Sequence, residues 1–224
     1  MIALQLRRWR FGQVAPLTLG LTILVSVGGL SFALLQGWPL WLVGTATVIP
    51  WLPILTIDAA RIFRMYQWLA LFYVLVVTQT GHLLEHVAQM FQIHVLALTG
   101  ADARGVFGTL DIEWVHFLWN TWVLLAVVVL LRHFGANRWL WLTALFSSWH
   151  AVEHAYILSV YLTTGLSRTP GLLAEGGALG GGLPVTRPDL HFLYNLIETV
   201  PLITAFLYQA QRSAPGASRL VGKR

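Results

Sequence analysis

The strongest constraint on this chain is a series of apolar segments that covers most of its length. Six of them lie near residues 14–36, 38–56, 66–98, 111–132, 137–165 and 189–210. Each is close to or above the roughly 20 residues that an α-helix needs to cross the hydrocarbon of a bilayer. The segments therefore predict an all-α integral membrane protein with six transmembrane helices. The limits of the second segment are the least defined, because Pro39, Pro50 and Pro53 interrupt it.

The small number of charged residues supports lipid as the surroundings of the chain. Only 10% of the residues are charged, whereas a soluble domain carries about 25%. The chain has no cysteine, which excludes disulfides and thiolate metal sites. We read the basic, apolar N-terminus as a retained first helix, because its apolar stretch is too long for a cleaved signal.

The positions of the basic residues predict the orientation of the helices. Six crossings place both termini on one side, together with Arg7, Arg8, Arg10, Arg61, Arg64, Arg132, Arg138, Arg212, Arg219, Lys223 and Arg224. Only Arg104, Arg168 and Arg187 lie on the other side. Cytoplasmic segments carry the excess of Lys and Arg, so we expect both termini in the cytoplasm of a plasma or inner membrane. The net charge of +5 is then a topology signal, and we expect no nucleic-acid partner.

Two sequence motifs occur twice in the second half of the chain. The third segment carries H-x-x-E-H (His82, Glu85, His86), and the fifth repeats it with His150, Glu153 and His154. The fourth segment carries H-F-L-W-N (His116 to Asn120), and the sixth carries H-F-L-Y-N (His191 to Asn195). The order is the same in both halves, with offsets of 68 and 75 residues. This pattern predicts a four-helix core built from a duplicated helical hairpin.

The predicted organisation is a single membrane domain over residues 1–224. Residues 1–64 form two peripheral helices, 65–133 the first hairpin, 134–212 the second hairpin and 213–224 a cytoplasmic tail. We expect Asp58, Arg61 and Arg64 in a solvated cytoplasmic loop. The glycine-rich loop 166–188 lies on the outer side above the motifs, where it serves as a flexible connector or as a lid.

Helical geometry places the motif side chains together. A helix turns 100° per residue, so the two histidines and the glutamate of each H-x-x-E-H motif share one face. Polar stripes of helices in lipid face inward, toward each other. Both H-x-x-E-H motifs lie near the outer ends of their helices, and His116 and His191 lie within the first two turns of theirs. All eight side chains are therefore expected in one layer near the outer membrane face.

This layer predicts a metal centre. Six imidazoles and two carboxylates suffice for two transition-metal ions, with the glutamates as bridging or direct ligands, and imidazole suits iron or copper as well as zinc. Iron and copper fit a redox role better. The predicted ligands are His82, Glu85, His86, His116, His150, Glu153, His154 and His191. Polar neighbours expected to orient these ligands are Glu113, Asn120, Asn195 and Glu198. His94 and His133 lie outside the motifs, and we expect no ligand role for them.

The H-x-x-E-H motif resembles the H-x-x-H-H boxes of membrane fatty-acid desaturases and hydroxylases, which are multi-histidine di-iron proteins. The resemblance covers the short motifs alone, and Glu85 and Glu153 stand where those boxes have a histidine. It implies oxidative chemistry with O₂ on a lipophilic substrate. H-x-x-E-H is also the inverted zinc-protease motif, in which one zinc is bound and the glutamate is a general base. Its duplication, with further histidines on two more helices, fits that motif poorly.

Three functions remain open from the sequence. The first is a membrane oxidoreductase with a dinuclear non-haem metal centre, supplied with electrons by another protein or a quinol. The second is a haem b- or pigment-binding electron-transfer subunit beside other membrane subunits. The third is a metal-ion transporter, which intramembrane His and Glu also suit. The apolar cytoplasmic halves of the core helices disfavour transport, because a transport path needs polar groups through the whole membrane.

Overall fold

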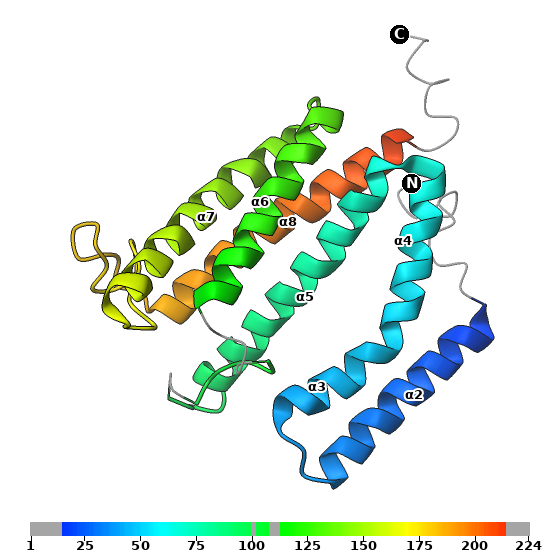
Figure 1. Ribbon diagram of the computed structural model, residues 1–224, viewed down its shortest axis with the longest axis horizontal. Helices are drawn as coiled ribbons and strands as arrows, with labels where there is room; N and C mark the ends of the chain where they lie inside the picture. Colours follow the sequence, from blue (N-terminus) through cyan, green and yellow to red (C-terminus); the bar gives the residue numbers. More distant parts are fainter. Residues whose placement is uncertain (1–14, 100–101, 108–112, 214–224) are drawn as a thin grey trace. The chain divides into compact units, whose positions relative to one another are not determined.

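The computed structural model describes residues 15–99, 102–107 and 113–213, so the predicted tail at 213–224 lies outside these ranges except for Ser213. In this part of the chain the fold is helical, and no strand is formed beyond an isolated bridge between Gly177 and Gly181. The elements are α2 (Pro16–Leu35), α3 (Leu40–Val48), the 3₁₀ turn η1 (Ile49–Trp51), α4 (Leu52–Tyr66), α5 (Trp68–His94), α6 (Glu113–Phe134), α7 (Arg138–Thr164) and α8 (Arg187–Ser213) (Figure 1).

The lengths and compositions of the helices are those of an integral membrane protein. Within the described residues, five spans are long and apolar enough to cross a bilayer: Pro16–Leu35, Leu40–Tyr66, Trp68–His94, Glu113–Phe134 and Arg187–Ser213. Large apolar side chains such as Leu24, Leu118 and Leu145 are exposed on the helix surfaces, as expected where lipid is the solvent. Helix α7 has 27 residues but is not among these spans, and its crossing stays a prediction.

The second span differs from its predicted limits. The sequence predicted an apolar segment at 38–56 followed by a cytoplasmic loop with Asp58, Arg61 and Arg64. The structure shows this loop prediction to be wrong, because α3, η1 and α4 follow one another without a break from Leu40 to Tyr66. Pro50 and Pro53 stand in the first turns of η1 and α4, where a missing N–H costs no helical hydrogen bond. Asp58 is buried in α4 and lies 3.5 Å from Arg61, one turn further on.

The helices divide into two compact units, and α5 and α8 contribute to both. This division does not follow the predicted hairpin limits at 65–133 and 134–212. The first unit comprises residues 15–74 and 206–213 of the described chain. In it α2 packs against α3, where the Ser26 hydroxyl donates a hydrogen bond to the Thr47 carbonyl at 2.6 Å. The rings of Phe72 and Phe206 meet edge to face at 5.5 Å between centroids.

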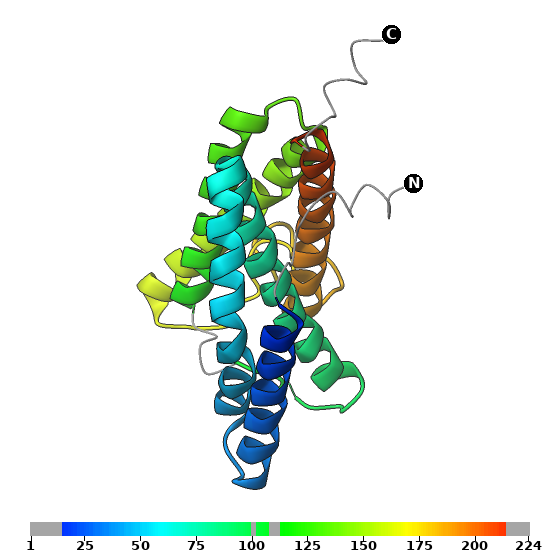
Figure 2. The same cartoon turned by 90° about the vertical axis from the view of Figure 1, so that its right-hand side faces the viewer.

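The second unit, Leu75–Ala205, contains all the predicted site residues. Helices α6 and α7 lie side by side in both views (Figures 1 and 2). They are joined by a short turn that ends at Asn137. The Asn137 side chain caps α7 by accepting from the backbone N–H groups of Trp139 and Leu140, and it also donates to the Ala205 carbonyl. Because this turn reverses the chain, α7 runs antiparallel to α6.

The interior of this unit changes in character along its length. Toward the α6–α7 turn it is apolar, with Leu75, Val127, Leu130, Leu140 and Leu202 fully buried. Toward the opposite end the buried side chains are polar. This polar end is where α6 and α8 begin and where α5 and α7 approach their ends, so four helices can present histidines to one place.

Candidate metal centre

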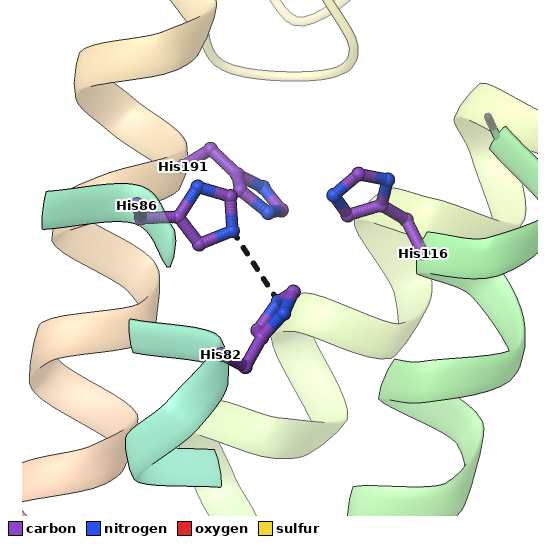
Figure 3. Close-up of side chains that lie close together, drawn as sticks. All are labelled: His82, His86, His116 and His191. Atoms are coloured by element: carbon purple, nitrogen blue, oxygen red, sulfur yellow. Dashed lines mark hydrogen bonds between the residues drawn. The ribbon is translucent and has the colours of Figure 1, made fainter. Parts of the chain in front are cut away.

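The structure brings all six predicted histidines together in the second unit. Two groups have ligand nitrogens within 4.8 Å of one another: His82, His86, His116 and His191 form the first, and His150, His154 and His191 form the second. Figure 3 shows the first group, in which the rings face a common space from three helices. Five of the six side chains are at most 9% exposed, and His82 is half-buried. The six histidines therefore lie close together, and their role as metal ligands stays a prediction.

Helical spacing explains how each group forms. His82 and His86 are four residues apart on α5, and His150 and His154 are four apart on α7, so each pair projects from one face at successive turns. His116 lies in the first turn of α6, and His191 in the second turn of α8. Each pair is thus joined by a histidine from the helix that follows it in the chain: His116 on α6 follows the pair on α5, and His191 on α8 follows the pair on α7. The stacked rings of His116 and His154, 5.3 Å apart, connect the two groups.

The distances between ring nitrogens fit a shared metal ion. Nε2 of His150 and Nε2 of His154 lie 3.4 and 3.3 Å from Nδ1 of His191. Nε2 of His82 and Nε2 of His86 are 3.3 Å apart. Metal–imidazole bonds of 2.0–2.1 Å in a tetrahedral arrangement place neighbouring ligand nitrogens about 3.3–3.4 Å apart. The rings therefore already stand at the separation that a metal ion requires.

Two polar side chains fix which nitrogen faces the centre. Nδ1 of His150 lies 2.8 Å from Oε2 of Glu198, a buried carboxylate whose other oxygen accepts from the Ser147 hydroxyl. A carboxylate only accepts, so Nδ1 of His150 carries the proton and Nε2 presents a lone pair inward. Gln89 acts in the same way on His86: its amide nitrogen donates to the Ala103 carbonyl, which leaves its oxygen to accept from Nδ1 of His86.

The cluster has fewer N–H protons than ring-nitrogen lone pairs that could accept them in hydrogen bonds. Nδ1 of His191 can donate to His150 or to His154, but it has one proton for two acceptors. Nε2 of His191 and Nδ1 of His154 are buried without a hydrogen-bond partner. A buried nitrogen without a partner is costly, and converging lone pairs repel one another. A cation between the rings offsets the repulsion of the converging lone pairs and can bind Nε2 of His191, so the donor set fits a transition-metal ion.

The two motif glutamates lie beside the histidine groups, and their predicted role as metal ligands stays a prediction. Neither Glu85 nor Glu153 belongs to the two ligand groups. Oε1 of Glu85 accepts from the backbone N–H of Phe107 at 2.7 Å, and Oε1 of Glu153 accepts from that of Leu172 at 2.9 Å. Each carboxylate thus holds the loop that follows its own helix. The motif spacing predicted the face of the helix correctly, but it could not reveal the loop backbone that meets the carboxylate.

The four polar neighbours predicted to orient ligands divide into three roles. Glu198 contacts a ligand ring, as described. Asn120 and Asn195 each donate to the backbone carbonyl of a histidine one turn earlier, His116 and His191, at 2.9 Å. Glu113 accepts two hydrogen bonds from the Arg187 guanidinium and one from the backbone N–H of Arg168. It therefore ties the start of α6 to the start of α8.

Sequence reasoning missed three polar residues that support the cluster. Gln79 is buried, donates to Asn195 and accepts from the Trp119 indole, while Gln89 and Ser147 act as described above. Each stands three residues from a histidine on the same helix: Gln79 from His82, Gln89 from His86 and Ser147 from His150. Polar residues one turn from a motif histidine in an apolar helix were the available signal.

A cavity of about 220 Å³ opens onto the histidine cluster. Its walls are formed by His86, Gln89, Glu113, His116, Arg168, Arg187, Pro188 and His191. Ligand histidines thus form one wall, and two arginines with a glutamate form another. Sequence analysis placed Arg168 and Arg187 on the outer side but assigned them no role at the site.

His94, which the sequence left without a ligand role, is outside both groups. Its Nε2 lies 2.6 Å from Oδ1 of Asp189 on α8, at an exposed position. In comparisons with known proteins, no family model, no curated protein and no solved structure matches this chain.

Proposed function

We propose that this chain is a membrane oxidoreductase with a dinuclear non-haem metal centre of iron or copper, held by six histidines near the outer membrane face. The observation that carries the proposal is the pair of histidine groups, whose nitrogens stand at ligand spacing around two places. Bound metal would supply redox and O₂ chemistry there. The residues of the chain hold the ions, orient the rings through Glu198 and Gln89, and line a cavity beside the cluster.

The ligand set of this proposal consists of histidines, with Glu85 and Glu153 as anchors of the loops above the centre. Each ion takes three histidines: His82, His86 and His116 from one hairpin, and His150, His154 and His191 from the next. Equivalent helix pairs that each supply a triad support the duplicated hairpin predicted from the sequence. The matching loop contacts of Glu85 and Glu153 support it as well.

His191 differs from the other five histidines of this proposal, because it belongs to both groups. Its Nδ1 faces His150 and His154, while its Nε2 is buried without a hydrogen-bond partner. Its ring lies 4.5 Å from that of His86 and 5.2 Å from that of His116. We therefore propose His191 as the ligand shared by the two ions.

The packing of the rings favours metal ions over a haem. Neighbouring histidine rings lie 4.5–5.3 Å apart, which is direct contact. A porphyrin between axial histidines would have to separate these rings and the four helices that carry them.

The interior below the cluster favours a closed centre over a transport path. The polar layer continues through Asn120, Asn195, Ser147 and Glu198 to the buried Thr143 and Thr199. Beyond it Val127 and Leu130 on α6 and Leu202 on α8 are fully buried. An ion leaving the cluster toward the α6–α7 turn would have to lose its ligands without replacement.

The proposal includes the surroundings of the protein. With both termini in the cytoplasm, the positive-inside rule places the histidine layer near the outer face. The lipid bilayer contacts the helix surfaces. Electrons come from a partner protein or from a quinol, with other membrane subunits as possible carriers.

Metal analysis of the freshly purified protein tests the proposal. Elemental analysis should find two iron or copper ions per chain, and the optical spectrum should lack a Soret band. A Soret band would replace the proposal with the haem-binding function. Negligible metal in the fresh protein, followed by no uptake on titration with Fe(II), Cu(II) or Zn(II), would leave a hydrogen-bonded polar core and refute the metal centre.

A further inference from the structure

The cavity beside the histidines indicates the class of molecule that reaches the centre. Of the eight described residues that line it, Pro188 alone is apolar. A lipid chain needs an apolar channel, because burying methylene groups against polar and charged walls gives little hydrophobic stabilisation and desolvates those walls. The guanidinium, amide and imidazole groups at these walls can form hydrogen bonds with a small ligand that carries charge.

Positive side chains predominate at the described walls of the cavity. Among the described residues that line it, Arg168 and Arg187 contribute two cations and Glu113 one anion. The Arg187–Glu113 pair is bidentate, at 3.1 and 2.8 Å, and fixes the guanidinium at the wall. Bound metal ions on the histidine wall would add further positive charge. A small anion entering the cavity would therefore meet cations on two sides.

The backbone of the loop holds Arg168 at this wall. Arg168 has a positive φ of 61°, a conformation that non-glycine residues rarely adopt without a compensating contact. Its N–H donates to Oε1 of Glu113 at 2.8 Å, and this contact offsets the strain. Four residues further on, the Glu153–Leu172 hydrogen bond attaches the same loop to α7. Arg168 is thus placed at the cavity by a specific arrangement of the chain.

From these observations we infer that the substrate or co-substrate of the centre is a small water-soluble anion of a few heavy atoms, such as an oxyanion. It enters between Arg168 and Arg187 and reaches the wall formed by His86, His116 and His191. This inference rests on the proposed metal centre and deepens it by naming the substrate class. It differs from the lipophilic substrate that the resemblance to desaturases and hydroxylases implies.

Azide binding to the copper-loaded protein tests the inference. Metal content is measured first, and azide is then titrated while the charge-transfer absorption of the azide complex is followed. We expect saturable binding in the wild type, and an affinity about tenfold lower in Arg168→Gln, as for loss of a hydrogen bond to a charged group. Arg168→Lys, which keeps the charge, should lose less, and Arg104→Gln should match the wild type because Arg104 does not line the cavity.

The outcomes separate this inference from the proposed function. Equal azide affinity in Arg168→Gln and the wild type, or no azide binding to a protein that holds copper, overturns the anion pocket and leaves the metal centre standing. Displacement of azide by a long-chain alcohol overturns it in favour of a lipophilic substrate. A protein that takes up no metal overturns the proposed function and this inference together.

Discussion

At the scale of single residues, the histidines differ in the number of ligand groups to which each one belongs. His191 has both ring nitrogens directed into the cluster, one toward His150 and His154 and the other without a hydrogen-bond partner. His150 belongs to one group only, and Glu198 fixes its ring. These differences predict different consequences for removing each ring.

We expect His191→Ala to lower the metal content from two ions to one and to weaken binding of the remaining ion, because the second group keeps only His150 and His154 while the first keeps three of its four histidines. His150→Ala should remove one ion and leave the group of His82, His86 and His116 occupied. Elemental analysis of the purified variants measures the number of ions, and competition with a chelator measures the affinity. His94→Ala is the control: it removes an exposed histidine that contacts Asp189, and it should keep both ions. Retention of both ions in His191→Ala would contradict its ligand role, and an unchanged affinity for the remaining ion would contradict the shared-ligand role.

Glu198→Gln should lower metal affinity without creating a cavity in the interior of the protein. The amide has nearly the same shape, but it loses the charge that accepts the His150 Nδ1 proton at 2.8 Å. Changes of such outer carboxylates cost about 10- to 100-fold in metal affinity. Competition with a chelator of known affinity measures the change. Glu175→Gln, at an exposed loop position, should have no effect, and a wild-type affinity in Glu198→Gln would refute the orienting role.

The residues of the candidate site show what the sequence could and could not predict. The histidines were predictable because their spacing within one helix places them on a common face. In a membrane, such a polar face turns toward the interior of the protein and away from lipid. The partners of Glu85 and Glu153 were not predictable, because they are backbone N–H groups of loops whose path no periodicity encodes. The cavity arginines depend on the same loops, and for this reason they too were missed.

At the scale of elements, two loops are attached in the same way to the helices that precede them. Gly105 and Gly171 both have a positive φ, of 71° and 80°, and both stand against the carboxylate of a motif glutamate. A Cβ at either glycine would collide with Oε1 of Glu85 or Glu153. Glycine is therefore required at both positions for two reasons, the backbone conformation and the close approach.

Gly171→Ala should detach the loop 165–186 from α7. The added Cβ displaces the Glu153 carboxylate from the Leu172 N–H and adds the strain of a positive φ. Gly180→Ala is the matched control, because it has a φ of 64° and open space around its Cβ; it should cost only about 1 kcal/mol. Thermal unfolding in detergent should show a larger loss for Gly171→Ala. Limited proteolysis within the loop should also be faster, and equal behaviour of the two variants would contradict the attachment.

The limits of the helices were predictable where the apolar segments end in loops, and wrong where prolines were taken as breaks. The third, fourth and sixth segments lie within a few residues of α5, α6 and α8. The second did not, because a proline in the first turn of a helix is compatible with that helix. Asp58 and Arg61 were assigned to a loop because they are charged, although an ion pair spaced by one turn also forms on a helix.

At the scale of the whole molecule, the direction of the helices in the second unit decides how many times the chain crosses the membrane. Helices α6 and α8 both begin at the histidine end, and both are long and apolar enough to span a bilayer. After α6 has crossed, the chain can return to that end only through α7. The polar residues that make α7 less apolar are Thr143, Ser147, His150, Glu153 and His154, and all of them are buried in the protein.

We therefore predict that α7 is a sixth transmembrane helix and that both termini lie in the cytoplasm. The chain has no native cysteine, so single cysteines can be introduced as Arg104→Cys in the loop between α5 and α6 and as Leu220→Cys near the C-terminus. In intact cells, a membrane-impermeant maleimide should label position 104, and position 220 should react only after the membrane is opened. If α7 did not cross, α8 would end on the other side and position 220 would be labelled from outside. Labelling of position 220 but not of position 104 in intact cells would contradict the predicted orientation, because the positive-inside rule places the histidine layer and its cavity on the side of Arg104.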